Sequence, residues 1–414
     1  MRRSGSGLAR ARSLALVPAL ALVCGQARAA EYSMESSAEA NAGYSEDIDV
    51  GGGSGGGGGT TNSPTQTSVV KMKLGVRTPS LNVSADTLVN YTVYTADSRL
   101  NSDNQYLTLN GNYREELTTY GLTGSYARTT TLTTGFQETG RQIQQNSRQQ
   151  FLSVAPSWQR QITPLDSLSF SPSYRNVNQS SQNRPDSETY GGTSTWSRFL
   201  DPATTGFVSA NSQFYNSNSN GSLESLSVGG SLGVSHQFSP TLSASLSAGP
   251  VWVKQRSRLN SNQGGLFDIS NSQLNSDNSS IGYQINSSLS YEMSERTGFS
   301  GAIIRNISPN TTSGLVQETT SLSLGVNHSL LRQVSVAFRG YFAHSEDVAD
   351  GGSSRTRDYA EAAPSIQWRA REDLRLALTY RFRWQYFEDD NENGNGSAVF
   401  ASVIYDLPRV AVSR

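Results

Sequence analysis

The stretch LSVGGSLGVSHQFSPTLSASLSAGPVWV (residues 226–253) decides the fold, because it alternates apolar side chains with serine or glycine. The apolar side chains occupy even positions from Leu226 to Phe238, and they do so again from Leu242 to Trp252. Successive side chains of a β-strand point to opposite faces, so a period of two predicts strands and not a helix. The intervening Ser239-Pro240-Thr241 predicts a hairpin turn.

Two environments can cover the apolar face of such strands: a second sheet in a soluble sandwich, or the lipid around a membrane barrel. Only 35% of the 414 residues are hydrophobic and 16% are charged, so the chain is poor in the side chains that fill protein cores. A closed barrel in lipid needs one apolar parity per strand, and it pairs all backbone groups without leaving a sheet edge. The composition therefore favours a membrane barrel.

The N-terminus has the order of a secretory signal. Four arginines precede the apolar run Leu14–Val23, and Ala27-Arg28-Ala29 follows as a cleavage site. We predict a Sec signal peptide over residues 1–29, cleaved near Ala29, because ten apolar residues are too few for a membrane anchor, which needs about 20. Cys24 is the only cysteine, so the mature chain is expected to have no disulfide and no thiolate chemistry.

The charge balance argues against nucleic acid as a partner. Removing the five arginines of the leader from the 33 basic residues leaves 28 against 34 acidic residues, a net charge of -6. The sequence has no basic tail, stripe or RNA-binding motif.

Short and long polar connections alternate along the chain. The short turn signals lie at 78–80, 115–118, 163–166, 201–204, 239–241, 293–297, 331–332 and 371–373. The long connections lie at 51–66, 97–104, 138–148, 178–187, 216–222, 257–278, 308–313, 347–357 and 388–396. Outer-membrane barrels show this asymmetry, with tight turns on the periplasmic side and long loops outside.

These signals predict an all-β protein with a single antiparallel up-and-down transmembrane β-barrel over residues 30–408. The connections give about 18 strands, and 16 is the alternative count. Residues 51–66 are expected to form a flexible glycine-rich loop, and residues 409–414 a short C-terminal tail. A propeller or β-helix would also repeat, but it would not alternate short and long connections.

Four stretches carry a resemblance to a known family: LTGSYARTTTLTTGFQETG (122–140), APSWQRQITPLDSLSFSPSY (155–174), SLGVSHQFSPTLSASLSAGP (231–250) and SAVFASVIYDLP (397–408). They resemble the outer-membrane β-barrel porins found with exopolysaccharide and PEP-CTERM loci. AGYSEDIDV (42–50) is similar to the first strand of that family, although Ser45-Glu46-Asp47-Ile48 departs from its usual Tyr-Asp-Asp-Asn pattern. The resemblance implies an outer-membrane barrel in a Gram-negative bacterium, with a polysaccharide exit channel as one function, and it brings no catalytic residues.

The search for reaction chemistry gives little. The three histidines are His236, His328 and His344, and the first two share the lipid parity near short turns, where an interfacial ring is the expected role. His344 stands beside Glu346 and Asp347, which allows a metal site but fits a solvated loop mouth better. No hydrolase, zinc-protease, P-loop or EF-hand motif occurs. We therefore expect no enzyme activity, no metal and no cofactor.

One group of charged residues is a candidate functional site. Its members share the lumen parity on neighbouring strands: Arg339, Glu361, Arg375, Arg381 and Arg383. They form either a basic strip that eases passage of an anionic solute or a cross-strand ladder of charges that neutralise one another. Both interpretations place these side chains inside the barrel.

Three classes of function remain open. The favoured one is a porin-like channel that passes polar solutes or exopolysaccharide through a wet lumen. A non-conducting barrel that serves as a scaffold for a periplasmic export component is the alternative, and it would have a lumen plugged by residues 51–66. An outer-membrane enzyme would need a shielded His-Ser pair, which three histidines make improbable. The expected partners are outer-membrane lipid, the solute and the export component.

Overall fold

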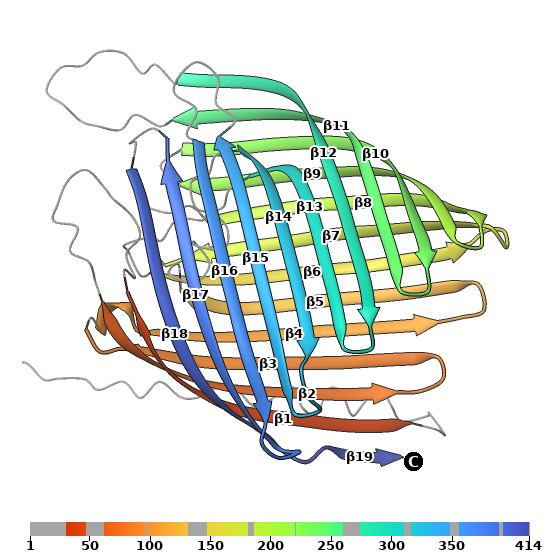
Figure 1. The fold of residues 1–414 in the computed structure, drawn as a ribbon. Coiled ribbons are helices and arrows are strands. Elements are labelled where there is room, and N and C mark those ends of the chain that lie inside the picture. The colour runs from red at the N-terminus through yellow and green to blue at the C-terminus, as the bar shows by residue number, and fades with distance from the viewer. Residues whose placement is uncertain are drawn as a thin grey trace, which may run out of the picture.

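The computed structural model describes residues 30–46, 62–96, 98–130, 147–180, 186–219, 221–259, 274–309, 316–347, 356–388 and 392–413. Almost all of them belong to one antiparallel sheet in which sequential strands are neighbours. The last strand pairs with the first, which closes the sheet. The fold is therefore the 18-stranded up-and-down barrel that the sequence predicted (Figure 1). The signal peptide and most of the glycine-rich loop lie outside the described residues.

The first nine strands are β1 (Glu31–Ser45), β2 (Ser63–Arg77), β3 (Leu81–Tyr94), β4 (Ser102–Arg114), β5 (Thr118–Thr130), β6 (Arg148–Gln161), β7 (Asp166–Gln179), β8 (Asp186–Asp201) and β9 (Thr204–Ser219). The others are β10 (Gly221–Ser239), β11 (Leu242–Leu259), β12 (Leu274–Ser294), β13 (Thr297–Pro309), β14 (Val316–Ser329), β15 (Val334–Asp347), β16 (Thr356–Arg369), β17 (Leu374–Phe387), β18 (Glu392–Asp406) and β19 (Val410–Ser413). A short 3-10 helix, η1 (Ser98–Leu100), precedes β4. In the part of the chain that the structure describes, no helix is long and apolar enough to cross a bilayer.

The hairpin that opened the sequence analysis is β10–β11. Leu232 lies opposite Ala248, and the turn is held by the Ser239 hydroxyl, which accepts a hydrogen bond of 3.0 Å from the Leu242 amide. The even positions carry exposed apolar side chains, such as Leu232 at 67% and Leu246 at 52%. The parity with these side chains faces outward, and the serine and glycine parity faces the lumen.

The outward apolar face has the height of a bilayer. On β11 it runs from Leu242 to Trp252, and Lys254 follows on the same parity. Ten residues of strand span about 33 Å, or about 23 Å across the membrane at a tilt of about 45°. An outer-membrane barrel has an apolar band of about 25 Å, so this length fits a transmembrane wall.

The described strands extend into several of the connections that the sequence predicted. β2 begins at Ser63, inside the loop expected over 51–66, and β18 begins at Glu392, inside the loop expected over 388–396. The loop expected over residues 216–222 is replaced by β9 and β10, which stay paired up to Ser219 and Gly221. The C-terminal tail forms β19, in which Val410–Ser413 pairs with β1 as a continuation of β18. Pro408 cannot donate a backbone hydrogen bond, and the strand is interrupted there before it resumes one residue out of step.

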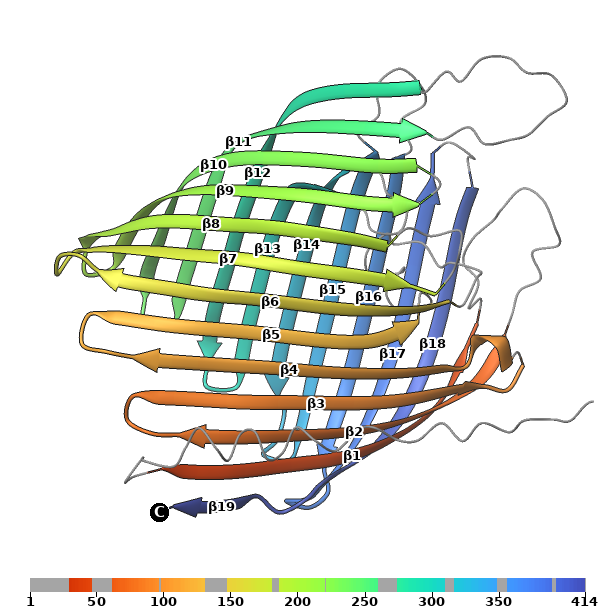
Figure 2. The same cartoon turned by 180° about the vertical axis from the view of Figure 1, so that it is seen from behind.

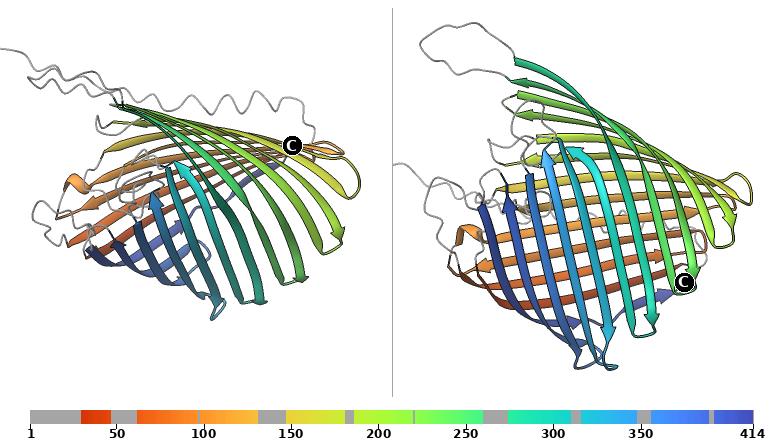
Figure 3. Two further views of the ribbon diagram at one scale, coloured as in Figure 1. Left: turned by 90° about the horizontal axis from the view of Figure 1, so that it is seen from above. Right: turned by 45° about the horizontal axis from the view of Figure 1, so that its top comes forward.

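The wall of the barrel has two broad faces. Strands β1–β9 form one face and β13–β18 the other, and their strands cross at a steep angle (Figures 1 and 2). Strands β10–β12 bend from one face into the other along the edge of the barrel (Figure 3). A sheet needs glycine at such bends, because a side chain there would collide with the neighbouring backbone.

The bend follows a diagonal row of glycine and proline across β7–β12. Its members lie at neighbouring heights on β7, β8 and β10–β12, whereas β9 has serine and asparagine there: Pro172, Gly192, Gly229, Gly230, Gly249, Pro250 and Gly282. A Cβ on Gly249 would lie 1.8 Å from the carbonyl oxygen of Gly230, so only glycine allows this approach.

Gly249→Ala should destabilise the barrel, because the added methyl group meets the backbone of β10 and not a movable side chain. We expect a loss of about 2 kcal/mol or more in the free energy of unfolding, measured by urea titration of the refolded protein. Gly301→Ala is the matched control, because its Cβ would make an ordinary contact of 3.6 Å with Leu324. Equal stability of the two variants would contradict the account of the bend.

Candidate functional site

The predicted charge strip lies on the lumen side of β15–β17. On β17 the even positions carry exposed apolar side chains, among them Leu378 and Tyr380. The odd positions Arg375, Arg381 and Arg383 therefore point inward. The same test, with Phe338 on β15 and Trp368 on β16 as outward residues, places Arg339 and Glu361 on the lumen side.

The strand register arranges these residues in rows across the wall. Tyr341 lies opposite Glu361, and Glu361 lies opposite Arg383. Arg339 lies opposite Ala363 in the adjacent row, near the Pro364 position where the ladder between β16 and β17 is interrupted. Glu361 thus has Arg383 as its direct cross-strand neighbour.

Arg375 is set apart from the other arginines by an ion pair. Its guanidinium donates two hydrogen bonds to the carboxylate of Asp406 on β18, from Nε to Oδ2 at 2.8 Å and from Nη2 to Oδ1 at 2.7 Å. A two-pronged pair of this kind fixes the side chain and neutralises its charge. Asp406, which the sequence analysis did not single out, therefore cancels the arginine nearest the turn end.

Arg381 rests on an aromatic ring. Its guanidinium carbon lies 5.1 Å from the ring centre of Phe400 on β18. The ring in turn lies over Gly43 on β1, where a Cβ would be only 2.5 Å from the Phe400 Cδ1 atom. Gly43 thus makes room for the ring, and the cation–π contact holds the Arg381 charge against the lumen wall.

Arg383 and Gln385 lie in the buried part of the lumen wall. Arg383 is 8% exposed and Gln385 is 1% exposed. Neither amide atom of Gln385 makes a hydrogen bond with another described residue. A buried amide without partners costs about 1–3 kcal/mol, and a polar molecule in the lumen would remove that cost.

The burial follows a gradient along the barrel axis. On β2, Ser63 and Thr65 near the long loops are buried, whereas Lys71 and Lys73 toward the turns are exposed. The other strands show the same trend, as Gln149 on β6 illustrates at 0% exposure. The loop half of the described lumen wall is therefore tightly packed, and the turn half is open to water.

Tyrosines line the loop half beside the arginines. The Tyr359 hydroxyl donates a hydrogen bond of 2.8 Å to Glu361, and its ring lies 5.9 Å from that of Tyr341. Tyr94 on β3 lies close enough to Arg381 and Arg383 for their charges to act on its hydroxyl group. β3 and β17 are four strand positions apart around the wall, so Tyr94 and these arginines face the same stretch of the lumen.

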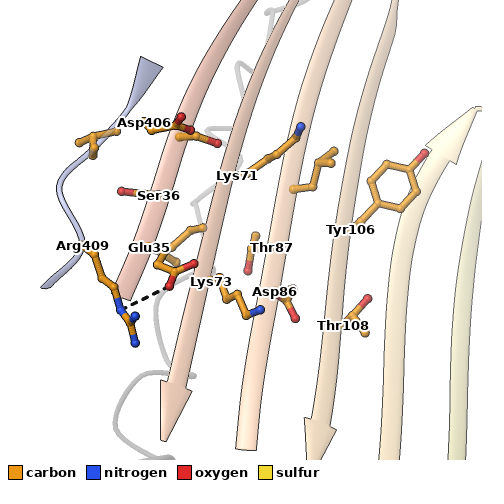
Figure 4. A pocket seen from close by; sticks show the side chains of 14 residues that line it. Glu35, Ser36, Lys71, Lys73, Asp86, Thr87, Tyr106, Thr108, Asp406 and Arg409 are labelled. Carbon is orange, nitrogen blue, oxygen red and sulfur yellow. Dashed lines mark ion pairs between the residues drawn. The ribbon is translucent and has the colours of Figure 1, made fainter. Parts of the chain in front are cut away.

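A recess of about 650 Å³ opens into the wall on β1–β4 (Figure 4). Its charges are of both signs and partly paired. Lys71 forms an ion pair with Glu39 at a nitrogen–oxygen distance of 3.3 Å, and Arg409 forms ion pairs with Glu31 at 3.2 Å and with Glu35 at 3.4 Å. Lys71 and Lys73 alternate with Val70 and Met72, so the period-two rule could have found them as lumen residues. This side of the lumen carries no excess of either charge near the recess.

The histidines all lie on the outward parity. His236 and His328 meet the hydroxyls of Thr204 and Thr297 at 2.7 and 2.8 Å near the short turns. His344 lies 2.7 Å from the Asp358 carboxylate near the loop end. Within the described ranges, no three histidine, cysteine or acidic residues are grouped as metal ligands.

Comparison with solved structures gives several barrels of low similarity. The chain is similar to the ferric-catecholate import receptor Fiu of E. coli K12 in its open form, with 8% identity, a TM-score of 0.45 and coverage of 90% of this chain and 81% of that one. It is similar to Pseudomonas aeruginosa OccK2 (OpdF) in complex with glucuronate, with 12% identity, a TM-score of 0.44 and coverage of 91% and 98%. It is also similar to Acinetobacter baumannii OccAB4, with 11% identity, a TM-score of 0.42 and coverage of 93% of this chain and 99% of that one.

No family model matches the sequence, and the search of curated proteins gives no significant match. The strand pairing by itself shows that the fold is a closed barrel.

Asp406→Asn should raise the preference of the lumen for anions, because it releases the charge of Arg375. A unit charge acting at about 7 Å through water changes the energy of an ion by about 0.6 kcal/mol, with opposite sign for anions and cations, which is about sevenfold in their permeability ratio. Reversal potentials across a planar bilayer with a salt gradient measure this ratio. Asp166→Asn, the same change on the outward parity, is the control. An unchanged ratio in Asp406→Asn would show that Arg375 does not act on the lumen.

Proposed function

We propose that the protein is an outer-membrane channel of a Gram-negative bacterium that passes polar solutes, after removal of residues 1–29. The single observation that carries the proposal is the closed barrel with an apolar band outside and a polar wall inside. Such a wall is stable only if water fills part of the lumen, and barrels of about 16 to 18 strands leave an aqueous channel.

The loop half of the lumen favours anionic solutes. Among the side chains that the structure describes on β15–β17, the inward charges above the turns are Arg339, Arg357, Arg381, Arg383 and Glu361. Fixed charges act most strongly where a channel is poorly hydrated, and Arg383, which is 8% exposed, lies in such a part of the wall.

A polysaccharide is the finer proposal for the solute. Tyr94, Tyr341 and Tyr359 line the same half, and aromatic rings beside hydrogen-bonding groups suit the alternately apolar and hydroxylated surfaces of sugars. The resemblance to barrels of exopolysaccharide loci supports the same class of solute. An acidic sugar would meet both the rings and the arginines.

The non-conducting scaffold is the second candidate, and the burial gradient favours it. Gln149 and Gln385 on the lumen wall are almost without exposed surface. A lumen filled at this level would block passage and leave the barrel as an anchor for an export component.

Single-channel conductance in a planar bilayer separates the two candidates. The channel proposal predicts stable steps with anion preference from the refolded chain. Arg339→Ala, Arg381→Ala and Arg383→Ala together should lower the anion-to-cation permeability ratio at least about twentyfold, since each charge changes the energy of an ion by roughly 0.6 kcal/mol. Glu361→Gln should shift the ratio in the opposite direction.

The contrary outcomes are distinct. A protein that migrates as a folded barrel before heating but gives no conductance would favour the scaffold. Conductance with the same ion preference in the triple variant and the wild type would leave the channel but make the arginines a structural ladder.

A further inference from the structure

The hydrogen bonding between β12 and β13 stops halfway up the wall. The two strands pair from Ser294 opposite Thr297 to Ile285 opposite Arg305. Beyond this point β12 continues back to Leu274 with β11 as its partner, and β13 continues to Pro309 with β14 as its partner. On its β13 side, no described strand pairs with β12 between Leu274 and Gln284.

This seam begins where the wall still faces lipid. Tyr283 and Ile281 lie on the outward parity of the unpaired stretch, with exposures of 49% and 80%. Backbone groups without partners are costly in hydrocarbon, and an open edge is avoided in membrane barrels. A wall that leaves such an edge at the outer part of its apolar band has a built-in weak line.

Side chains close the seam in place of backbone hydrogen bonds. A Cβ atom on Gly282 of β12 would collide with the Cδ1 atom of Ile307 on β13. The absence of a side chain on Gly282 therefore makes room for the Ile307 side chain. The guanidinium of Arg305 lies 4.0 Å from the centre of the Tyr283 ring, and it also pairs with Glu318 on β14. Side-chain contacts of this kind separate without breaking a ladder of hydrogen bonds.

A buried apolar cluster passes through the wall at this seam. It consists of Val251, Val253, Ile307 and Val316. The two residues of β11 have the lumen parity, whereas Ile307 and Val316 have the outward parity of β13 and β14. Residues of opposite faces meet in one cluster only where the sheet is interrupted, so the seam holds an apolar path from the lipid side to the lumen side.

We propose that the β12–β13 seam is a lateral portal that admits the acyl chain of a membrane amphiphile while its polar head occupies the lumen. The lining fits this ligand because the path is apolar and the lumen beyond it is polar. Ile307 acts as the latch, since its side chain fills the gap over Gly282. The portal requires a folded barrel but no passage of ions through the lumen, so it can be tested independently of the proposed channel.

Photo-crosslinking from the lumen side tests the portal. A photoreactive residue replaces Val253, behind the seam, in protein reconstituted into phosphatidylethanolamine bilayers with a radiolabelled oleoyl chain. Ala343 is the matched control, because it is also buried and lumen-facing, but β15 is hydrogen-bonded along both edges. We expect at least about fivefold more lipid label at position 253 than at 343. Equal labelling at the two positions would overturn the portal.

A second pair of variants tests the latch. Ile307→Ala should increase lipid labelling from position 253 several-fold, because it removes the side chain over Gly282. Ile303→Ala is the control, since Ile303 lies on the same strand and parity opposite Ser287 in the paired part. Heat modifiability on gels shows that both variants have folded. If Ile307→Ala labels no more than Ile303→Ala, the latch role of Ile307 is overturned.

Discussion

The structure depends on the need to pair every backbone N–H and C=O group inside a wall that faces lipid. The pairing of β18 and β19 with β1 meets this need where the two ends of the barrel wall join. Arg409 stabilises this junction by forming ion pairs with Glu31 and Glu35. Once the sheet supplies the hydrogen bonds, only one parity of each strand must be apolar. The low hydrophobic content is a consequence of this division.

The same constraint divides the lumen into two functional levels. The wall of the turn half is exposed to water and carries paired charges, including Arg375 with Asp406. The wall of the loop half is more buried, and it carries guanidinium groups and tyrosine rings on β15–β17. A solute that entered from the turn half would meet neutralised charge first and the positive strip later, at the level where screening by water is weakest.

The sequence predicted the parts of the fold that depend on local alternation. Leu226 to Trp252 sufficed for a hairpin, and the parity of β17 sufficed to place its arginines inward. Features set by contacts between distant strands were not accessible in the same way. The pairing of Glu361 with Arg383 depends on the register between β16 and β17. The Arg375–Asp406 ion pair depends on a partner 31 residues away in the sequence. The β12–β13 seam depends on the position at which the hydrogen bonds between these two strands end. The loop expected over residues 216–222 was wrong because serine and asparagine are compatible with both a loop and a strand that has water on one side.

The central claim is that one parity of each strand meets lipid and the other meets water. Single spin labels at each position from Arg375 to Phe382, in the chain that starts at Ala30 and reconstituted in bilayers, test it most directly. Since Cys24 is the only natural cysteine, each introduced cysteine carries the sole label. The account predicts that even positions collide preferentially with oxygen dissolved in the lipid and odd positions with a water-soluble nickel chelate. Accessibility without this alternation would contradict it.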